Sequence, residues 1–377
     1  MSKKILCVFP NDPIIAYYQK GEIKERYFNP MNIFTEIHII SFTKEEIGED
    51  KVKEIAGNAE IHIHTVGKIS LRKRENNVGR IIELVEQIKP DVIRAFNPRL
   101  GGWFAAICAQ KLHIPFFLSL HTQHDYARNL MKKSSFKKYL ALKYTEKFIE
   151  PFVIKNADTI TIVFKIIEPY VIKHSGNSPQ LLYNRIDYNR FQNGNPIPTL
   201  KFPLIISVGN LIKEKNHECL IKAMKKIDAN CLIIGNGPNY QNLTRLIEKE
   251  DLADKISIIK SVPHEKIQDY YKSAKLFALA YDPELEGLPM PVIEAMAAGL
   301  PVVIPFPNPS FSDGLENVAV FAKREPSSYA EKITMLLEDD SKYQEYSKKS
   351  QIKAKDFDSQ KIEKTEARIY HELISKR

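Results

Sequence analysis

The sequence has few cysteines and lacks any long apolar run. Its four cysteines among 377 residues form no Cys-x-x-Cys pair. They are scattered inside apolar segments, which argues against a zinc site and favours buried, reduced thiols in a cytosolic protein. No apolar run approaches the ~18 residues that a membrane helix needs. The apolar stretch 5–9 is too short for a secretory signal, so we expect a first buried strand there.

A complete Gly-x-Gly-x-x-Gly dinucleotide fingerprint is also missing. Residues 235–238 read Gly-Asn-Gly-Pro, without the third glycine and without an acidic residue closing a following strand. This disfavours a hydride-transferring oxidoreductase and favours an ordinary turn from strand to helix.

What is present is a regular alternation of short apolar runs and longer amphipathic segments. This alternation is typical of parallel sheets that are covered on both faces by helices. It runs twice, with a Gly/Pro/Asn-rich stretch at 193–199 between the two runs. The length also suits two domains. The sequence therefore predicts an α/β protein with two Rossmann-like domains, 1–195 and 196–356, followed by a C-terminal helix over 357–377.

The expected strands are short and buried. In the N-terminal half they are 4–9, 36–42, 61–65, 91–95, 115–120, 158–163 and 180–182, and in the C-terminal half 203–208, 230–234, 256–259, 276–279, 301–305 and 318–321. Ligands of open parallel sheets bind beyond the carboxyl ends of the strands. The loops that follow these strands are therefore the places to look for chemistry.

Two of these loops in the C-terminal half carry charged candidates. Lys215, in the loop that begins at Gly209 and Asn210, could present its ammonium group to a phosphate. Glu286 lies in the loop after strand 276–279, and Glu294 follows on the first turns of a helix. A carboxylate there could bind vicinal hydroxyls of a ribose or a sugar. The start of that helix would bind a diphosphate through backbone N–H groups and the helix dipole, around Gly287, Leu288, Pro289 and Met290.

Taken together, these segments resemble retaining glycosyltransferase family 4, part of glycosyl transferases group 1. The spacing of seven residues between Glu286 and Glu294 is specific in this context. The similarity covers most of the chain and is clearest from about residue 203 to 304. The matching stretches are Val208-Gly209 with Lys215, then 233–238, 270–277 and 286–302.

The resemblance implies the GT-B fold, with two domains facing a central cleft and a C-terminal helix crossing back onto the first. It implies that Glu294 holds the ribose of the nucleotide and that Glu286 contacts the donor sugar. Lys215 would neutralise the diphosphate leaving group, so no metal is required. The stretch that contains Val262, residues 261–264, would hold the base largely through its backbone.

Two departures from the family pattern bear on the donor. Asn210 stands where the family usually has an arginine that helps Lys215 to hold the diphosphate. Losing one charge-assisted hydrogen bond costs about 1.5–3 kcal/mol unless another group supplies it. Residues 305–314 also replace a Gly-Gly-x-x-Glu turn that relatives often carry.

In the N-terminal half, strand 115–120 ends at His121, which matches the family's histidine over the reaction centre. His124 and Asp125 are the second choices. Arg99 follows another strand and is consistent either with a phosphate contact or with an exposed loop arginine. The glycine-rich first loop of relatives is absent, so no site residue is assigned there.

The charge is unevenly distributed along the chain. Residues 1–195 carry 29 Lys and Arg against 20 Asp and Glu, whereas residues 196–377 carry 26 of each. Such an excess suggests that the N-terminal half contacts something anionic. Within it, the stretch 131–154 places lysines on one helix face with Phe136, Leu140 and Tyr144. That face is consistent with an anionic membrane surface or with a solvated, partly packed helix.

We therefore expect a retaining hexosyltransferase that uses a UDP- or GDP-sugar and a glycan or lipid-linked acceptor. The resemblance makes envelope polysaccharide synthesis in the cytoplasm plausible, with peripheral contact to the plasma membrane. A GT-B nucleotide-sugar epimerase is one alternative, which would release an isomerised sugar instead of a nucleoside diphosphate and a glycoside. A non-catalytic nucleotide- or nucleic-acid-binding protein is another, motivated by the isoelectric point of about 9.0, but the sequence lacks the reading module that nucleic-acid binding needs.

Overall fold

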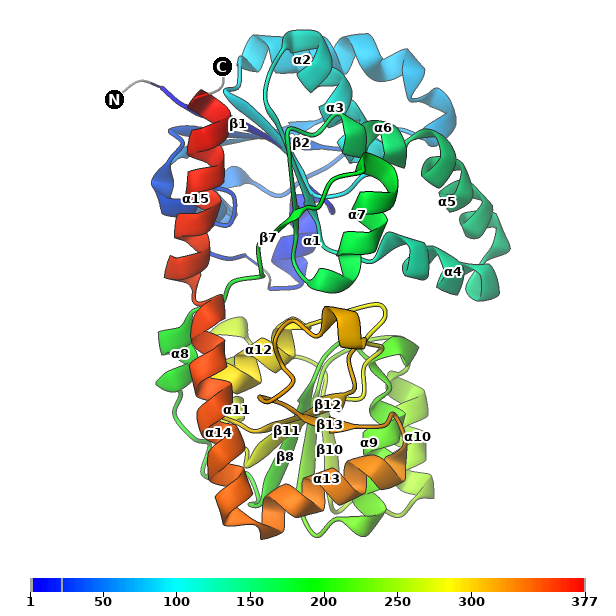
Figure 1. Ribbon diagram of the computed structural model, residues 1–377, viewed down its shortest axis with the longest axis vertical. Coiled ribbons are helices and arrows are strands. Elements are labelled where there is room, and N and C mark those ends of the chain that lie inside the picture. Colours follow the sequence, from blue (N-terminus) through cyan, green and yellow to red (C-terminus); the bar gives the residue numbers. More distant parts are fainter. Residues whose placement is uncertain (1–2, 22, 376–377) are drawn as a thin grey trace. The chain divides into compact units, whose positions relative to one another are not determined.

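The computed structural model describes residues 3–21 and 23–375. These residues form two compact units (Figure 1). The first unit runs to Tyr183 and takes up again from Ile362, and the second is Asn184–Lys361. Each unit is a parallel sheet with helices on both faces. The predicted fold class, two Rossmann-like parallel-sheet domains, is confirmed.

The first unit is built on a seven-stranded sheet in the order β3-β2-β1-β4-β5-β6-β7. The inner strands β1, β4 and β5 are buried along their whole length and are apolar except for Arg94 and Ser119, which is why the sequence shows them as nearly continuous apolar runs. The strands are β1 Ile5–Phe9, β2 Glu36–Ser41, β3 Glu60–Thr65, β4 Val92–Ala95, β5 Phe116–Leu120, β6 Thr159–Ile162 and β7 Gln180–Leu181.

Helices cover both faces of this sheet. The helix α15 (Ser359–Ser375) buries Ile369 and Tyr370 in the same apolar cluster as strands β1 and β2. Buried Arg94 of β4 fixes it further by hydrogen bonds to Glu366 and to the Tyr370 hydroxyl. The other helices are α1 Ile14–Gln19, α2 Val78–Ile88, α3 Leu100–Leu112, α4 His124–Ser134, α5 Phe136–Phe148, α6 Glu150–Lys155 and α7 Glu168–Ser175.

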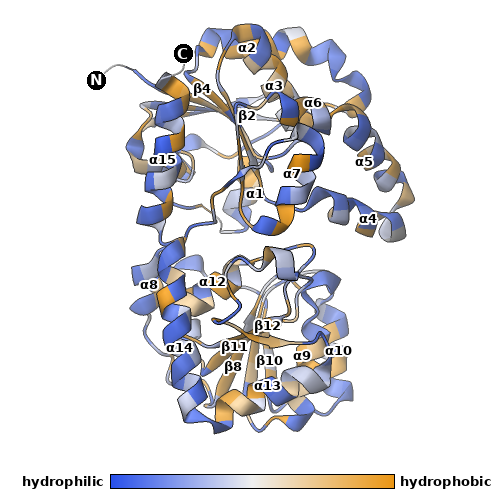
Figure 2. Cartoon of the chain, viewed as in Figure 1, coloured by the Kyte–Doolittle hydropathy of each residue, from blue (hydrophilic) through white to orange (hydrophobic). Residues whose placement is uncertain are grey.

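The second unit has a six-stranded sheet in the order β10-β9-β8-β11-β12-β13. Its central strands are coloured as hydrophobic in Figure 2. Helices α9, α10 and α13 bury their apolar sides on one face of this sheet. The strands are β8 Leu204–Val208, β9 Asn230–Ile234, β10 Ile256–Ile259, β11 Leu276–Ala278, β12 Val302–Pro305 and β13 Val320–Ala322. The helices are α8 Tyr188–Gln192, α9 His217–Ala223, α10 Tyr240–Lys249, α11 Ile267–Lys272, α12 Met290–Ala297, α13 Pro326–Glu338 and α14 Asp340–Ala354.

The Gly/Pro/Asn-rich stretch 193–199 is anchored on the second unit. The backbone N–H of Asn195 donates to Asp269 over 2.8 Å, and that of Ile197 donates to Ser273 over 2.7 Å. The preceding helix α8 also packs against α11 and α12. The change from one unit to the other thus lies at 183–184, and the boundary expected at residue 195 falls inside the second unit.

The basic stretch 131–154 is not one helix. Ser135 has an extended backbone that separates α4 from α5, and α6 begins after Ile149. The expectation of a single face running through this stretch was therefore wrong, because the chain changes direction twice. Figure 1 shows α4 and α5 projecting from the body of the first unit. In the described part of the chain, no helix combines the length and low charge that a bilayer crossing requires.

Candidate functional site

The loops after β8 and β9 lie against each other through their backbones. The N–H of Gly209 donates to the Ile234 carbonyl over 3.0 Å, and that of Leu211 donates to the Asn236 carbonyl over 2.9 Å. A Cβ on Gly235 would lie 1.9 Å from the Gly209 carbonyl oxygen. The first glycine of the Gly-x-Gly stretch is therefore required for this close approach, and it serves loop packing rather than a dinucleotide.

Lys215 and Glu286 meet at the carboxyl edge of this sheet. Lys215 closes a short 3-10 turn after β8 and is only 6% exposed. Its Nζ lies 2.5 Å from Oε2 of Glu286, whose side chain is 31% exposed. A Cβ on Gly209 would be 3.6 Å from the Lys215 Cδ, so the loop backbone lies beside the lysine stem. Asn210 is exposed and brings no charge to this pair.

His217, two residues after Lys215, is not a second cation. It is 1% exposed, and its Nδ1 is 3.3 Å from the Ser207 hydroxyl. Burial, together with the neighbouring charge of Lys215, lowers the pKa of His217 to about 4. At neutral pH the imidazole is uncharged, so Lys215 supplies the positive charge at this point.

The start of helix α12 offers fewer free backbone N–H groups for a diphosphate than the sequence predicts. Pro289 is its N-cap and Pro291 its second residue, and neither has an N–H group. The N–H of Val292 already donates to the Pro289 carbonyl over 3.0 Å. Gly287 and Leu288 are buried and Met290 is half-buried, and the Tyr281 hydroxyl fixes the loop by donating to the Gly287 carbonyl over 3.1 Å.

Glu294 is held by a residue that the sequence did not single out. The hydroxyl of Tyr271 donates to Oε2 of Glu294 over 3.0 Å and also lies 3.3 Å from the Pro291 carbonyl. Burial, reinforced by the Glu294 carboxylate, raises the pKa of Tyr271 well above its usual value. The phenol thus stays protonated and orients one carboxylate oxygen. The stretch 270–277 contains Tyr271 and matches the family pattern, but the sequence does not show that this tyrosine contacts Glu294.

The stretch 261–264, which is expected to hold the base, lies in the loop that follows β10. Val262 is half-buried and Pro263 is exposed. His264 begins a 3-10 turn, and its Nδ1 lies 3.1 Å from an Nη atom of Arg190. This loop belongs to the same unit as Lys215 and Glu294.

In the first unit, His121 directly follows β5. Its ring centroid lies 5.6 Å from that of Phe96. Burial, with Arg94 and Lys24 nearby, lowers the pKa of His121 to about 3. The imidazole is therefore neutral at physiological pH, which suits a hydrogen bond to a sugar hydroxyl better than donation of a proton as an imidazolium.

His124 and Asp125, the second choices for a site residue after β5, both contact charged side chains of the same unit. His124 is 5% exposed, and its Nδ1 lies 3.4 Å from an Nη atom of Arg99. Asp125 pairs with Arg128 at 2.6 Å and with Lys173 at 3.1 Å. Arg128, which the sequence did not single out, also bonds to buried Glu150 over 2.5 Å.

A cavity of about 450 Å³ opens at the carboxyl edge of the first unit's sheet. Arg99, at the N-cap of α3, contributes to its wall together with residues of α4 and α5. Its lining combines two cations and several polar groups with apolar surface, including Asn97, Arg99, Thr122, His124, Lys138 and Leu142. Such a lining suits a ligand that carries an anionic group.

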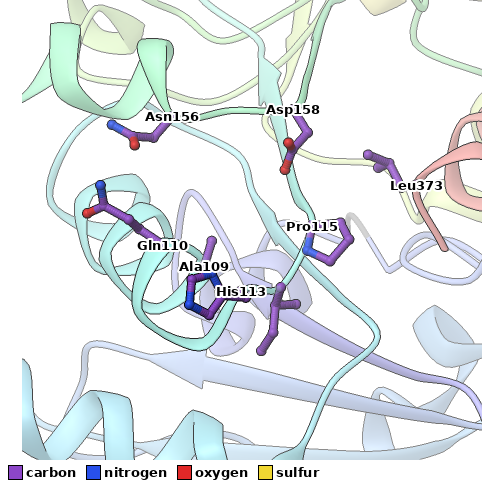
Figure 3. Close-up of a pocket in the computed structure, with 8 residues that line it drawn as sticks. Ala109, Gln110, His113, Pro115, Asn156, Asp158 and Leu373 are labelled. Atoms are coloured by element: carbon purple, nitrogen blue, oxygen red, sulfur yellow. The ribbon is translucent and has the colours of Figure 1, made fainter. Parts of the chain in front are cut away.

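A second cavity, of about 390 Å³, lies elsewhere on this unit (Figure 3). Its walls come from His113 and Pro115, which precede β5, and from Asn156 and Asp158, which precede β6. It therefore lies at the amino ends of the strands, where open parallel sheets do not bind their ligands. Asp158 is moreover engaged in accepting the N–H of Phe116 over 2.7 Å.

Comparisons with known proteins identify relatives among glycosyltransferases. The family described as glycosyl transferases group 1 matches residues 190–353. An uncharacterized glycosyltransferase of Haemophilus influenzae is 25% identical over 80% of this chain and 83% of its own length. A Campylobacter jejuni N-acetylgalactosaminyltransferase whose name specifies a diphospho-undecaprenol substrate is 31% identical over 48% of this chain and 51% of its own.

Solved structures share the fold. Anabaena HepE in complex with UDP and glucose superimposes with a TM-score of 0.73 at 15% identity, covering 98% of this chain and 100% of that one. The sucrose-phosphate synthase of Thermosynechococcus elongatus gives a TM-score of 0.73 at 14% identity over the whole of both chains. The GT-B architecture is thus shared over the full length.

Proposed function

We propose that this chain, whose residues 190–353 match glycosyl transferases group 1, moves a hexosyl group from a UDP- or GDP-sugar to a glycan or lipid-linked acceptor. We further propose that the anomeric configuration is retained. HepE was solved with UDP and glucose, which supports a nucleotide-sugar donor. Relatives include Bacillus subtilis TuaC, whose name assigns it to teichuronic acid biosynthesis, and this supports a role in envelope polysaccharide synthesis.

The observation that carries the proposal is the ion pair between Lys215 and Glu286. Its lysine is buried and its carboxylate is partly exposed. A donor diphosphate would take the place of Glu286 beside Lys215, with Asn210, the backbone at Gly209 and the segment Gly287–Met290 around it. Glu286, released from the lysine, would then accept hydrogen bonds from hydroxyls of the donor sugar.

Glu294 would bind the two ribose hydroxyls of the nucleotide. The Tyr271 hydroxyl fixes one carboxylate oxygen, so the carboxylate is oriented before the donor arrives. The loop around Val262 would hold the base through its backbone. His121, neutral and at the end of β5, would bind a hydroxyl near the reacting carbon.

In the reaction, the bond between the anomeric carbon and the diphosphate oxygen breaks and the acceptor oxygen bonds to the same carbon. The acceptor proton passes to the departing diphosphate oxygen, so no protein nucleophile is needed. The leaving group gains negative charge, which the ammonium of Lys215 stabilises, and a fixed cation in a partly buried site stabilises such charge more strongly than water does. This role for Lys215 requires no metal ion.

We propose that the acceptor is bound at the 450 Å³ cavity of the first unit and that α5 contacts an anionic membrane on the cytoplasmic side. Phe136, Leu140, Tyr144 and Phe148 form an exposed stripe along α5 at helical spacing, between 40% and 61% accessible. Lys137 and Lys147 on the same helix are also exposed. Basic residues beside an apolar stripe suit an interfacial helix. The alpha-monoglucosyldiacylglycerol synthase of Acholeplasma laidlawii, 24% identical, is a relative whose name specifies a lipid.

Donor binding is tested by thermal unfolding of the full chain with UDP, GDP, ADP and the corresponding sugar nucleotides. A ligand at 100 times its dissociation constant stabilises the folded state by about 2.7 kcal/mol. We expect one nucleotide class to shift the wild type and to leave Glu294→Ala unshifted. The matched control is Glu248→Ala, which removes an exposed carboxylate from α10 in the same unit and should respond like the wild type.

Two outcomes would contradict the proposal. The donor assignment is wrong if no nucleotide stabilises the wild type, or if Glu294→Ala responds normally. Product analysis with the stabilising sugar nucleotide then separates the alternatives. Release of a nucleoside diphosphate together with a new glycoside supports a transferase, whereas an isomerised free sugar supports an epimerase.

A further inference from the structure

The edge of the first unit's sheet carries a short motif twice. Strand β2 begins Glu36-Ile-His38-Ile, and strand β3 begins Glu60-Ile-His62-Ile. The two strands pair in parallel with Glu36 opposite Glu60 and His38 opposite His62. Residues two apart in a strand share a face. The repeated motif therefore brings two carboxylates and two imidazoles together on one face, and they belong neither to the Arg128 network nor to the candidate donor site.

The side chains of this array are close enough to share an ion. One ligand atom each from Glu36, His38 and His62 lie within 4.8 Å of one another. Nε2 of His38 is 3.4 Å from Oε2 of Glu36. Ligand atoms bound to zinc at about 2.0–2.1 Å in a tetrahedron lie roughly 3.3 Å apart. The rings of His38 and His62 stack with their centroids 4.6 Å apart, so small rotations would bring their nitrogens toward a common point.

A third histidine orients the first. Nδ1 of His38 lies 3.0 Å from Nε2 of His64, which leaves Nε2 of His38 directed toward Glu36. Histidines that bind metals commonly use their second nitrogen for such a hydrogen bond, which fixes the tautomer.

We propose that Glu36, His38 and His62 form a binding site for a divalent transition-metal ion such as Zn²⁺, with His64 as the positioning residue. Two imidazoles with one carboxylate suit such an ion, whereas Mg²⁺ and Ca²⁺ prefer oxygen ligands. The fourth position would be taken by water or by Glu60, whose Oε1 is 3.5 Å from Nε2 of His62 and whose side chain is 68% exposed. Lys3, 62% exposed and 2.6 Å from Glu36, forms a surface pair that a metal ion would displace.

The bound ion would fasten the edge strand β3 to β2. It would act on the stability of the first unit and not on the chemistry of transfer. The site lies along the strands, whereas His121 and the 450 Å³ cavity lie at their carboxyl ends. The inference therefore does not depend on the proposed donor or acceptor.

The site is tested on the full chain, purified without a polyhistidine tag, stripped with a chelator and titrated with Zn²⁺ by calorimetry and with Co²⁺ by visible absorption. We expect one ion per chain, the intense absorption of tetrahedral Co²⁺ and no competition from Mg²⁺. His62→Gln and Glu36→Gln should each weaken binding at least about tenfold, and His64→Gln by about 10–100-fold as a second-shell change. His371→Gln, which alters an exposed histidine of α15, is the matched control.

The proposal is overturned if the wild type binds no Zn²⁺ at a one-to-one ratio, or if His62→Gln and Glu36→Gln both bind it like the wild type. An equal loss in His371→Gln would also overturn it, since binding would then be unspecific. Thermal unfolding without metal establishes that each variant is folded. Transferase activity should be the same in His62→Gln and the wild type, so the outcome is separable from that of the proposed function.

Discussion

Arg128 in the first unit and Lys215 in the second are both buried cations near the carboxyl edge of a sheet, and they are partnered differently. Arg128 in α4, with a side chain 2% exposed, pairs with Asp125 at 2.6 Å, Glu146 at 3.4 Å and Glu150 at 2.5 Å. Among the described residues, Lys215 has one carboxylate within ion-pair distance, that of Glu286 at 2.5 Å. One cation is enclosed by several anions, and the other has a single, partly exposed partner.

The difference separates a structural cation from one that can exchange partners. The Arg128 network is closed further by Tyr170 and Thr145, which both donate to Glu150, so a ligand phosphate would have to break several bonds to enter. Displacing Glu286 from Lys215 breaks one ion pair, and the released carboxylate is partly exposed to solvent. A buried cation near a strand end is therefore a candidate for binding phosphate only when its partners are few and exposed.

The largest expected effect is on stability, from Arg128→Met. This change leaves Glu150 buried without its cation, and breaking a buried pair in this way costs about 3–5 kcal/mol. Urea denaturation should show that loss in the first unit, while nucleotide binding in the second unit is unchanged. Lys173→Met, which removes an exposed cation from the same network, should cost less than about 1 kcal/mol. Equal costs for the two variants would mean that the network is not structural.

The next effect is on catalysis, from Lys215→Met. Methionine preserves the packing of the buried stem, and Glu286 can turn to solvent, so we expect little change in stability. Removing one group that stabilises transition-state charge commonly lowers kcat by about 10²–10³-fold. Release of nucleoside diphosphate measures this loss. Lys213→Met, an exposed lysine of the same short turn, is the control. If both variants keep normal turnover, the cation does not serve the leaving group.

The sequence could predict features that depend on neighbouring residues, but not those that depend on contacts between distant segments. The second unit's strands, such as 230–234 and 256–259, were placed correctly because short apolar runs there are bounded by polar residues. Glu286 lies in the loop after β11 and Glu294 in the following helix α12, so local spacing was sufficient to single them out as donor candidates, and their roles stay predictions. Tyr271 and Arg128 were missed because their roles depend on partners that only the folded chain brings near.

Two further residues show where local patterns fail. Ser135 breaks the expected helix although serine is tolerated inside helices, so no local signal marked the change of direction. His38 and His62 lie in separate strands, and their meeting depends on the strand register. Periodicity predicts which residues share a face within one strand, but it does not predict which strands pair.

The smallest effect concerns the exposed charge, which also differs between the units. The excess of Lys and Arg lies in residues 1–195, and residues 196–377 are balanced. If that excess serves an anionic surface, lysines of the first unit should promote membrane binding and lysines of the second should not. The exposed apolar stripe of α5 places Lys137 and Lys147 where such a contact would form.

Binding of the full chain to vesicles with anionic lipid, measured by co-sedimentation, tests this contrast. A lysine near such a surface contributes about 1 kcal/mol, so each change to glutamine should weaken partitioning roughly fivefold. We expect Lys137→Gln with Lys147→Gln to bind more weakly than Lys226→Gln with Lys249→Gln, a matched pair of exposed lysines in the second unit. The difference should shrink as salt is added, because screening weakens exposed charges. If the two pairs lose affinity equally, the positive charge acts without regard to position, and α5 is not the contact.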